Sequence, residues 1–255
     1  MIGNLLKILK GLSLRYPRLH MVIAPFFRPL TSYVYQKERK RKNKIFQEYA
    51  LEALTLFDDS MRRAGVEYTL AFGSILGAIR EHGFIKHDLD IDTAVWIDDF
   101  TPSIIQELEK AGFVWVFEHM VDEGKLGRED TFEYRGVRID IFYLYPPINQ
   151  YPYCCDFLYE DGMKENQRLP RRIEVPFSRE RRKVPFENIE VYVPANAEEF
   201  CAFRYGPDYM VPNPSWSWIE EHDALVEWRE KIDVTSNRKY PHGNKITQTP
   251  YHREC

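Results

Sequence analysis

Acidic and apolar residues alternate in the segment Asp88–Asp92, which reads Asp-Leu-Asp-Ile-Asp. On a β-strand, successive side chains point to opposite faces, so Asp88, Asp90 and Asp92 would project together, away from a core that takes Leu89 and Ile91. Carboxylates this close repel one another, and their clustering is costly unless a cation or hydrogen bonds compensate. A hard divalent cation bound through oxygen, Mg²⁺ or Mn²⁺, is the simplest compensation.

Another carboxylate lies inside an apolar run further along the chain, where Asp140 stands between Ile139 and Ile141. An isolated acid is a poor choice for packing. It becomes useful if this strand lies beside the first and adds a carboxylate to the cluster. We therefore predict that Asp90, Asp92 and Asp140 are the catalytic residues and the metal ligands. Taken alone, the Asp90/Asp92 pair is equally compatible with a structural Ca²⁺ site or a loop-edge feature.

Gly73 and Ser74 end the strand-like segment upstream of the acidic run. Glycine lets a phosphate approach the backbone closely, and a serine at a helix start offers an N–H and a hydroxyl to phosphate oxygens. We predict that both bind substrate. Arg80 on the following helix either contacts phosphate or forms a structural salt bridge. Lys86 and His87 are further candidates for substrate binding, although a solvated loop explains these two residues slightly better.

The order of these elements resembles the nucleotidyltransferase superfamily, and its detail resembles the LicD/fukutin family within it. The resemblance runs from Phe46 to Pro214. A later Asp-Ile-Phe element matches Asp140–Phe142, and a Tyr-Gly element followed by proline matches Tyr205 through Pro212. Two positions depart from many bacterial members, which have tryptophan at His87 and an acid at Leu89. The matching positions in the first motif are Gly73, Ser74, Leu76, Gly77, Arg80, Gly83, Phe84, Ile85, Asp88, Asp90 and Asp92.

The resemblance implies an enzyme that moves a phospho-alcohol, such as phosphocholine or a polyol phosphate, from a CDP-linked donor to a glycan or glycolipid acceptor. The expected setting is capsule, lipopolysaccharide or teichoic-type synthesis. Two alternatives stay open. One is a nucleotidyltransferase that moves NMP to a hydroxyl or small molecule, and the other is a non-catalytic nucleotide-binding protein. The two departures leave the metal site intact and bear on the choice of donor.

These residues need an α/β (α+β) fold, with a small mixed sheet flanked by helices and a C-terminal helical extension. Apolar residues at helical spacing predict a helix from Phe46 to about Gly65. A helix is predicted from Thr101 to Lys110, with Pro102 at its first position and Gly112 beyond its end. The predicted strands are Glu67–Phe72, Leu89–Ile97, Phe113–His119, Thr131–Tyr134, Val137–Tyr143 and Ile189–Val193. Further helices are predicted at Ser74–His82, Ala195–Tyr205 and Trp216–Lys231.

Three regions follow from composition: a basic segment 1–44, the family-like domain 45–214, and a C-terminal helix and flexible tail 215–255. The first 44 residues carry eleven lysines and arginines and one acid, a net +10, so the net −4 of the chain leaves −14 for the rest. Leucines interleave with these bases, which favours an amphipathic helix on an anionic membrane surface. A solvated or partner-facing helix is the alternative.

The remaining composition excludes several classes of protein. The apolar segment Leu19–Leu30 is interrupted by Pro25, Arg28 and Pro29, and is too short to span a bilayer. The four cysteines form no CxxC pair, which favours reduced thiols in a cytoplasmic protein. The basic segment would place this protein peripherally on the inner face of a membrane. No nucleic-acid motif accompanies the bases. The basic stretch from Arg168 to Lys183 either binds an anionic substrate or balances surface charge.

Overall fold

A computed structural model describes residues 17–158, 168–213, 216, 225–226 and 234–238. Its main sheet has the strand order β1-β2-β5-β4-β3-β11, in which β2 and β5 are parallel and every other neighbouring pair is antiparallel. The fold is therefore the predicted mixed sheet flanked by helices. The strands of this sheet are β1 (Thr69–Leu70), β2 (Asp90–Trp96), β3 (Val114–Val121), β4 (Gly127–Tyr134), β5 (Val137–Leu144) and β11 (Val234–Arg238).

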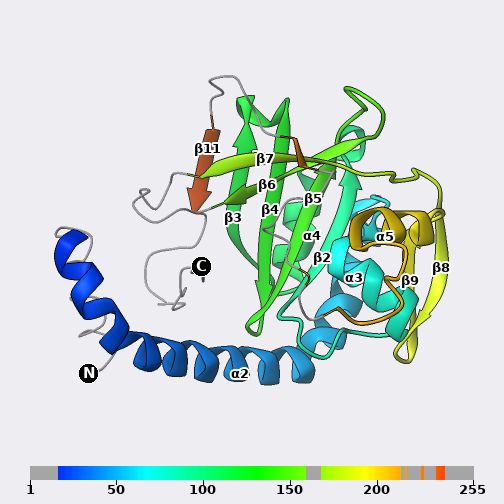
Figure 1. The fold of residues 1–255 in the computed structure, drawn as a ribbon. Coiled ribbons are helices and arrows are strands. Elements are labelled where there is room, and N and C mark those ends of the chain that lie inside the picture. The colour runs from blue at the N-terminus through cyan, green and yellow to red at the C-terminus, as the bar shows by residue number, and fades with distance from the viewer. Residues whose placement is uncertain (1–16, 159–167, 214–215, 217–224, 227–233, 239–255) are drawn as a thin grey trace.

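Two smaller sheets accompany the main one. β6 and β7 pair antiparallel, cross in front of the main sheet in Figure 1, and carry β10 at their edge. β8 and β9 form a separate hairpin beside α5. Their bounds are β6 (Tyr153–Leu158), β7 (Leu169–Glu174), β8 (Arg181–Phe186), β9 (Ile189–Pro194) and β10 (Leu225–Val226).

Helices flank both faces of the main sheet. The helical elements are α2 (Pro17–Ala64), α3 (Phe72–Leu76), η1 (Gly77–Glu81), η2 (Ile97–Asp99), α4 (Ser103–Lys110), η3 (Asp122–Gly124) and α5 (Ala197–Tyr205). α2 packs on β5 and α4, and α3 packs on β2 and α5. The ring of Phe142 on β5 meets Phe72 of α3 at 4.7 Å, and Phe72 in turn meets Phe200 of α5 at 6.0 Å. Because side chains alternate along β5, Asp140 shares the α3/α5 face with Phe142.

The long helix α2 is built from two different kinds of sequence. Its second half places Phe46, Ala50, Leu54, Phe57 and Met61 in the core, as the helical spacing predicts. Its first half extends past the sheet in Figure 1. The basic segment therefore joins the domain as one continuous helix from residue 17, while the leucine-rich stretch before it lies outside the described residues. Within the described part of the chain, no helix is both long and apolar enough to cross a bilayer.

The structure corrects several predicted elements. The first strand is only two residues long, and the expected helix Ser74–His82 begins earlier and becomes a π-helix at Gly77. A Cβ at Gly77 would lie 2.5 Å from the Gly83 carbonyl oxygen, so this close return of the chain requires glycine. The hairpin turning at Arg135-Gly136 and the helix stopped at Gly206 are confirmed.

The C-terminal prediction is partly wrong. Most of the expected helix Trp216–Lys231 lies outside the described residues, but Leu225–Val226 within it form a strand on β7. Val234–Arg238, predicted as part of a flexible tail, pair with β3 at the edge of the main sheet. Polar strands of this kind are recruited by backbone pairing with an existing edge, which leaves little trace in the sequence.

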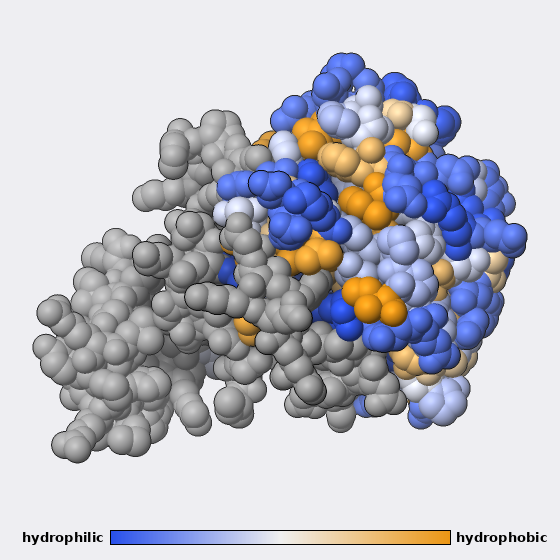
Figure 2. Space-filling model, turned by 90° about the horizontal axis from the view of Figure 1, so that it is seen from above, coloured by the Kyte–Doolittle hydropathy of each residue, from blue (hydrophilic) through white to orange (hydrophobic). Residues whose placement is uncertain are grey.

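The face in Figure 2 is mostly hydrophilic, with apolar residues in small patches.

Candidate active site

Asp92 on β2 lies directly opposite Asp140 on the parallel strand β5, and Asp90 lies opposite Arg138. The prediction that these two strands are neighbours is confirmed. Between the acids, Ile91 and Ile139 are fully buried on the other face. The alternation of the sequence therefore places the three predicted catalytic carboxylates on one face of two adjacent strands.

Gly73 and Ser74 lie against this cluster at the start of α3. The Gly73 N–H donates a hydrogen bond to the Asp92 carboxylate. A Cβ at Gly73 would lie 3.6 Å from Asp92 Oδ2 and 3.9 Å from Asp88 Oδ2, so the glycine backs directly on both acids. The buried Ser74 hydroxyl accepts a hydrogen bond of 3.0 Å from the Asp92 N–H, which fixes α3 to β2. Phe72, just before them, has the left-handed φ of 37°, a strain typical of functional sites.

The cluster cannot carry its full negative charge without help. Burial raises the pKa of Asp88 to about 7, with a further contribution from Asp90. Burial likewise raises the pKa of Asp140 to about 6, although the nearby Arg138 opposes the change. The pKa of Asp92 is raised well above its usual range, first by burial and then by Asp90, Asp140 and Asp88. Acids that raise one another's pKa in this way favour a bound cation.

The donor set fits a hard divalent ion, because it consists of carboxylate oxygens whose pKa values are raised first by burial and then by the neighbouring acids. The side chains are not yet in a ligating arrangement. Across the described ranges, no three histidine, cysteine, aspartate or glutamate side chains converge on a common point suited to a metal. One reason is visible at Asp140, whose Oδ1 accepts a short 2.6 Å hydrogen bond from the Thr131 hydroxyl.

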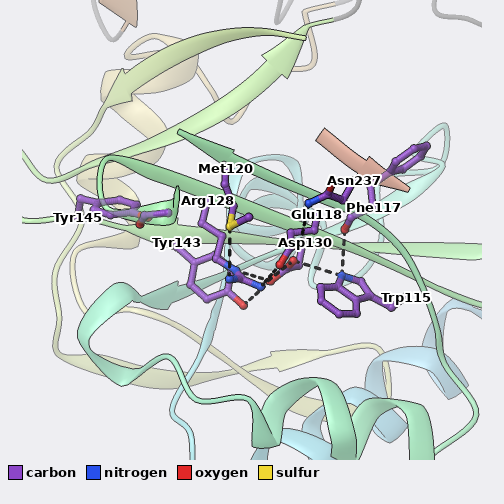
Figure 3. A network of polar contacts seen from close by, with 10 residues as sticks. Trp115, Phe117, Glu118, Met120, Arg128, Asp130, Tyr143, Tyr145 and Asn237 are labelled. Atoms are coloured by element: carbon purple, nitrogen blue, oxygen red, sulfur yellow. Dashed lines mark hydrogen bonds and ion pairs between the residues drawn. The ribbon is translucent and has the colours of Figure 1, made fainter. Parts of the chain in front are cut away.

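Thr131 is held by a polar network on the opposite face of β4. Its neighbour Asp130 is fully buried and accepts hydrogen bonds from Arg128 Nε at 2.8 Å and from the Tyr143 hydroxyl at 2.9 Å. Figure 3 shows Glu118 beside Asp130 at the same guanidinium, with Glu118 Oε1 3.0 Å from Arg128 Nη2. The network fixes the backbone of β4 and with it the hydroxyl that orients Asp140.

Glu129 is an additional acid that the sequence analysis missed. It lies on β4 two residues before Thr131, on the same face, and pairs with Phe142. Its pKa is raised well above its usual range by burial first and then by Asp140, Asp156 and Asp92. No motif marked it, because β4 becomes a neighbour of β5 only through the hairpin. The alternation that placed Asp140 would have placed Glu129 once that hairpin register was known.

The three basic candidates lie at the border of the cluster. The Arg80 side chain is one-tenth exposed, with Nε 2.8 Å from Glu81 Oε1 and Nη1 3.2 Å from the Tyr209 carbonyl oxygen. Its charge also lowers the pKa of nearby Asp88, so the structural salt bridge and proximity to the acids coexist. Lys86 and His87 are exposed on the loop before β2.

α2 reaches the same loop from below. The Asn43 side-chain amide donates hydrogen bonds to the carbonyl oxygens of Lys86 at 3.0 Å and Asp88 at 3.1 Å. One residue earlier, Lys42 helps to lower the pKa of Asp90, which burial raises. The basic segment thus contacts the acidic loop. The sequence did not predict this contact.

The Tyr205–Gly206 element closes the site on the side of α5. Burial raises the pKa of Tyr205, and Asp92 and Asp88 add to the rise, so the phenol lies near the acids. Its ring packs 4.8 Å from Trp216. The Tyr205–Gly206 motif therefore lies close to the acidic residues Asp88 and Asp92.

Known proteins match a large part of this chain. Mouse ribitol-5-phosphate transferase FKTN is 26% identical over 200 residues, which cover 74% of this chain and 41% of the relative. Its human counterpart is 23% identical over 199 residues, with the same coverage. Mouse ribitol 5-phosphate transferase FKRP is 27% identical over 171 residues, 61% of this chain and 31% of the relative. The chain thus spans about two fifths, or less, of the length of these relatives.

The family comparison agrees with the arrangement of the motifs. The sequence model of the LicD/FKTN/FKRP nucleotidyltransferase domain matches residues 65–196, just over half of the chain. This match contains Gly73, the acidic strand β2 and Asp140. The chain belongs to the LicD/FKTN/FKRP nucleotidyltransferase domain family.

Proposed function

We propose that this chain is a metal-dependent phosphotransferase that moves a phospho-alcohol from a CDP-linked donor to a hydroxyl of a glycan or glycolipid. The observation that carries the proposal is the pairing of Asp92 with Asp140 on adjacent parallel strands, against Gly73. The names of the relatives, which are ribitol-5-phosphate transferases, support a polyol phosphate over phosphocholine. The family resemblance of the motifs supports the CDP-linked donor.

The proposed reaction is an in-line transfer at the distal phosphorus of the donor. The oxygen of the acceptor hydroxyl forms a bond to this phosphorus, the bond to the bridging oxygen breaks, and CMP leaves with that oxygen. A Mg²⁺ or Mn²⁺ ion held by Asp90, Asp92 and Asp140 would neutralise charge on the phosphoryl group. Without a side chain, Gly73 would let a phosphate bound at the acids approach the backbone closely.

Asp140 receives the acceptor proton in this proposal. Burial raises its pKa to about 6 in the metal-free protein, and a bound cation would lower this value. The Thr131 hydroxyl donates to Oδ1, which orients the carboxylate so that Oδ2 meets the incoming hydroxyl. Asp88 and Glu129 enlarge the negative field that draws a cation to this face.

Product analysis distinguishes this proposal from its alternatives. The protein is incubated with Mg²⁺, a glycan acceptor and either labelled CTP or CDP-ribitol. The proposal expects CMP release and transfer of labelled ribitol phosphate only with CDP-ribitol. A nucleotidyltransferase would release pyrophosphate from CTP, and a nucleotide-binding protein would give no metal-dependent turnover with either. Asp92→Asn should be inactive, whereas the control Asp122→Asn should match the wild type. Asp122 lies on an exposed turn and has a φ of 48°, which asparagine also adopts.

A further inference from the structure

Arg204, in the last turn of α5, is a buried cation without a full set of partners. The residue is only 4% exposed. Its Nε and Nη1 atoms are buried and have no hydrogen-bond partner among the described residues. Burying a charged donor without acceptors is costly, and native proteins rarely keep such a group without a reason.

The nearest carboxylate is already occupied. Asp156 on β6 accepts a hydrogen bond from Arg171 Nε at 3.0 Å on Oδ1 and a second bond from Arg171 Nη2 on Oδ2. Arg204 therefore feels the charge of Asp156, while the hydrogen bonds of that carboxylate go to Arg171. Burial lowers the pKa of Arg204; Tyr205 and Asp156 oppose this, and Arg171 reinforces it.

Residues beside Arg204 lie close to the acidic cluster. Tyr205, the next residue of α5, feels the charges of Asp92 and Asp88. On the other side, Glu129 feels the charges of Asp140 and Asp156. Tyr205 on one side and Asp156 on the other thus connect Arg204 to the acids of β2 and β5.

Two structural explanations account for the position of Arg204 but leave its nitrogens unsatisfied. A cation is favoured near the C-terminus of a helix. The Trp216 ring also lies 5.4 Å from Arg204 Cζ, within range of a cation–π contact. Neither contact supplies an oxygen acceptor to Nε and Nη1. A ligand with several anionic oxygens in the plane of the guanidinium would.

We propose that Arg204 binds the oxygens of a substrate phosphate, forming the cationic side of the active site. The inference rests on the proposed transfer for the identity of the ligand. The phosphate belongs either to the CDP-linked donor or to a phosphorylated acceptor. In both cases the acids bind cations on one side of the phosphate, and Arg204 contacts it from the other.

The test measures binding rather than turnover. Dissociation constants for CDP, glycerol 3-phosphate and cytidine are determined with Mg²⁺ for the full chain and for Arg204→Met, Arg204→Lys and Arg182→Met. Methionine keeps the packing on Trp216 without the charge, and Arg182 is a surface arginine on the β8 hairpin that serves as the matched control. For Arg204→Met we expect binding of at least one phosphate compound to weaken about 10- to 100-fold relative to cytidine.

Arg204→Lys should fall between the methionine variant and the wild type, and Arg182→Met should match the wild type. Loss confined to CDP identifies the donor phosphate. If glycerol 3-phosphate binds at the same time as CDP and its affinity is the one weakened in Arg204→Met, Arg204 binds an acceptor phosphate. If both Arg204 variants keep the wild-type ratio of phosphate compounds to cytidine, the inference is overturned. Because no transfer is measured, Arg204-dependent binding by a protein that fails the CDP-ribitol assay would reject the proposed function alone.

Discussion

Thr131 and Asp140 are direct partners across β4 and β5, joined by a 2.6 Å hydrogen bond from hydroxyl to carboxylate. This bond lowers the pKa of Asp140 against the larger effect of burial. It connects the polar network on one face of the sheet to the reacting groups on the other. A residue that contributes to the pKa of Asp140 therefore lies outside the sequence motifs.

The first prediction concerns this bond. Thr131→Val should raise the pKa of Asp140 and move the acid limb of the kcat/KM profile to higher pH by up to about one unit. The rate at neutral pH should fall by about 10-fold, because the carboxylate is also less well oriented. Thr131→Ser restores the hydroxyl and should restore the profile. An unchanged profile in a folded Thr131→Val protein would remove Thr131 from this role.

The second prediction separates activity from stability. Asp92→Asn and Asp140→Asn should each reduce kcat by about 10²-fold or more, because each removes a proposed ligand. Without metal, the same variants should melt at a higher temperature than the wild type, since a buried, repelled charge is gone. One kcal/mol corresponds to about 2–4 °C for a chain of this size. Calorimetry in EDTA measures the shift, with Asp122→Asn as the control.

A destabilised but folded Asp92→Asn protein would contradict this account of the cluster. It would mean that the hydrogen bonds of the carboxylate, such as the one from the Gly73 N–H, outweigh the repulsion between the acids.

The third prediction concerns pH. The pKa of Asp88 is about 7 in the folded protein, against an ordinary value near 4, so the folded state binds a proton that the unfolded state releases. Its stabilising contribution is complete below about pH 4 and is lost as the pH rises through 7. Between pH 8 and 6.5, the metal-free protein should gain about 0.8 kcal/mol of unfolding free energy from this group.

A second group opposes part of this gain. Burial lowers the pKa of His119 to about 3, so as the pH falls below about 7.5 the unfolded state takes up a proton that the folded state refuses, and stability falls. Because the wild type and Asp88→Asn carry the same histidine contribution, urea titrations of both proteins between pH 6.5 and 8.5 isolate Asp88 by difference. Asp88→Asn should flatten the dependence of the unfolding free energy on pH in that window. Saturating Mg²⁺ should reverse the sign of this dependence in the wild type. A slope that persists in Asp88→Asn would assign the proton to another group.

The fourth prediction concerns the basic segment. We expect the protein to bind anionic vesicles and to dissociate as salt rises, because the charges on residues 1–44 act through the surface potential. Deleting all 44 residues would also remove the Asn43 hydrogen bonds to the acidic loop. A truncation at residue 31 and reversal of the exposed Lys37, Lys40 and Lys44 to glutamate avoid that loss. If both variants co-sediment with vesicles as the intact protein does, the proposed membrane contact is wrong.

The sequence predicted the acidic face because its information is local. The alternation of side chains along a strand determines which face Asp90, Asp92 and Asp140 share. Because burying an isolated carboxylate is costly, their positions in apolar strands imply that they lie together at one site. The partners of these acids were not predictable in the same way. Glu129 joins the cluster through strand pairing, Arg204 through the return of α5, and Asn43 through the path of a helix. Their side chains are ordinary in sequence and acquire a role only by proximity.

The edge strands escaped prediction for a different reason. β11 is polar and short, and it exists because the edge of β3 offers unpaired backbone groups. β10 consists of two apolar residues and likewise pairs with an edge, that of β7. In both, the backbone supplies the attraction, so side-chain patterns carry no signal.

The continuous helix α2 fixes a length. From Pro17 to Asn43 it rises by about 40 Å, at 1.5 Å per residue, before its side chain grips the carbonyl oxygens of the acidic loop. The helix therefore sets a constant distance between its first described turn and the acidic loop.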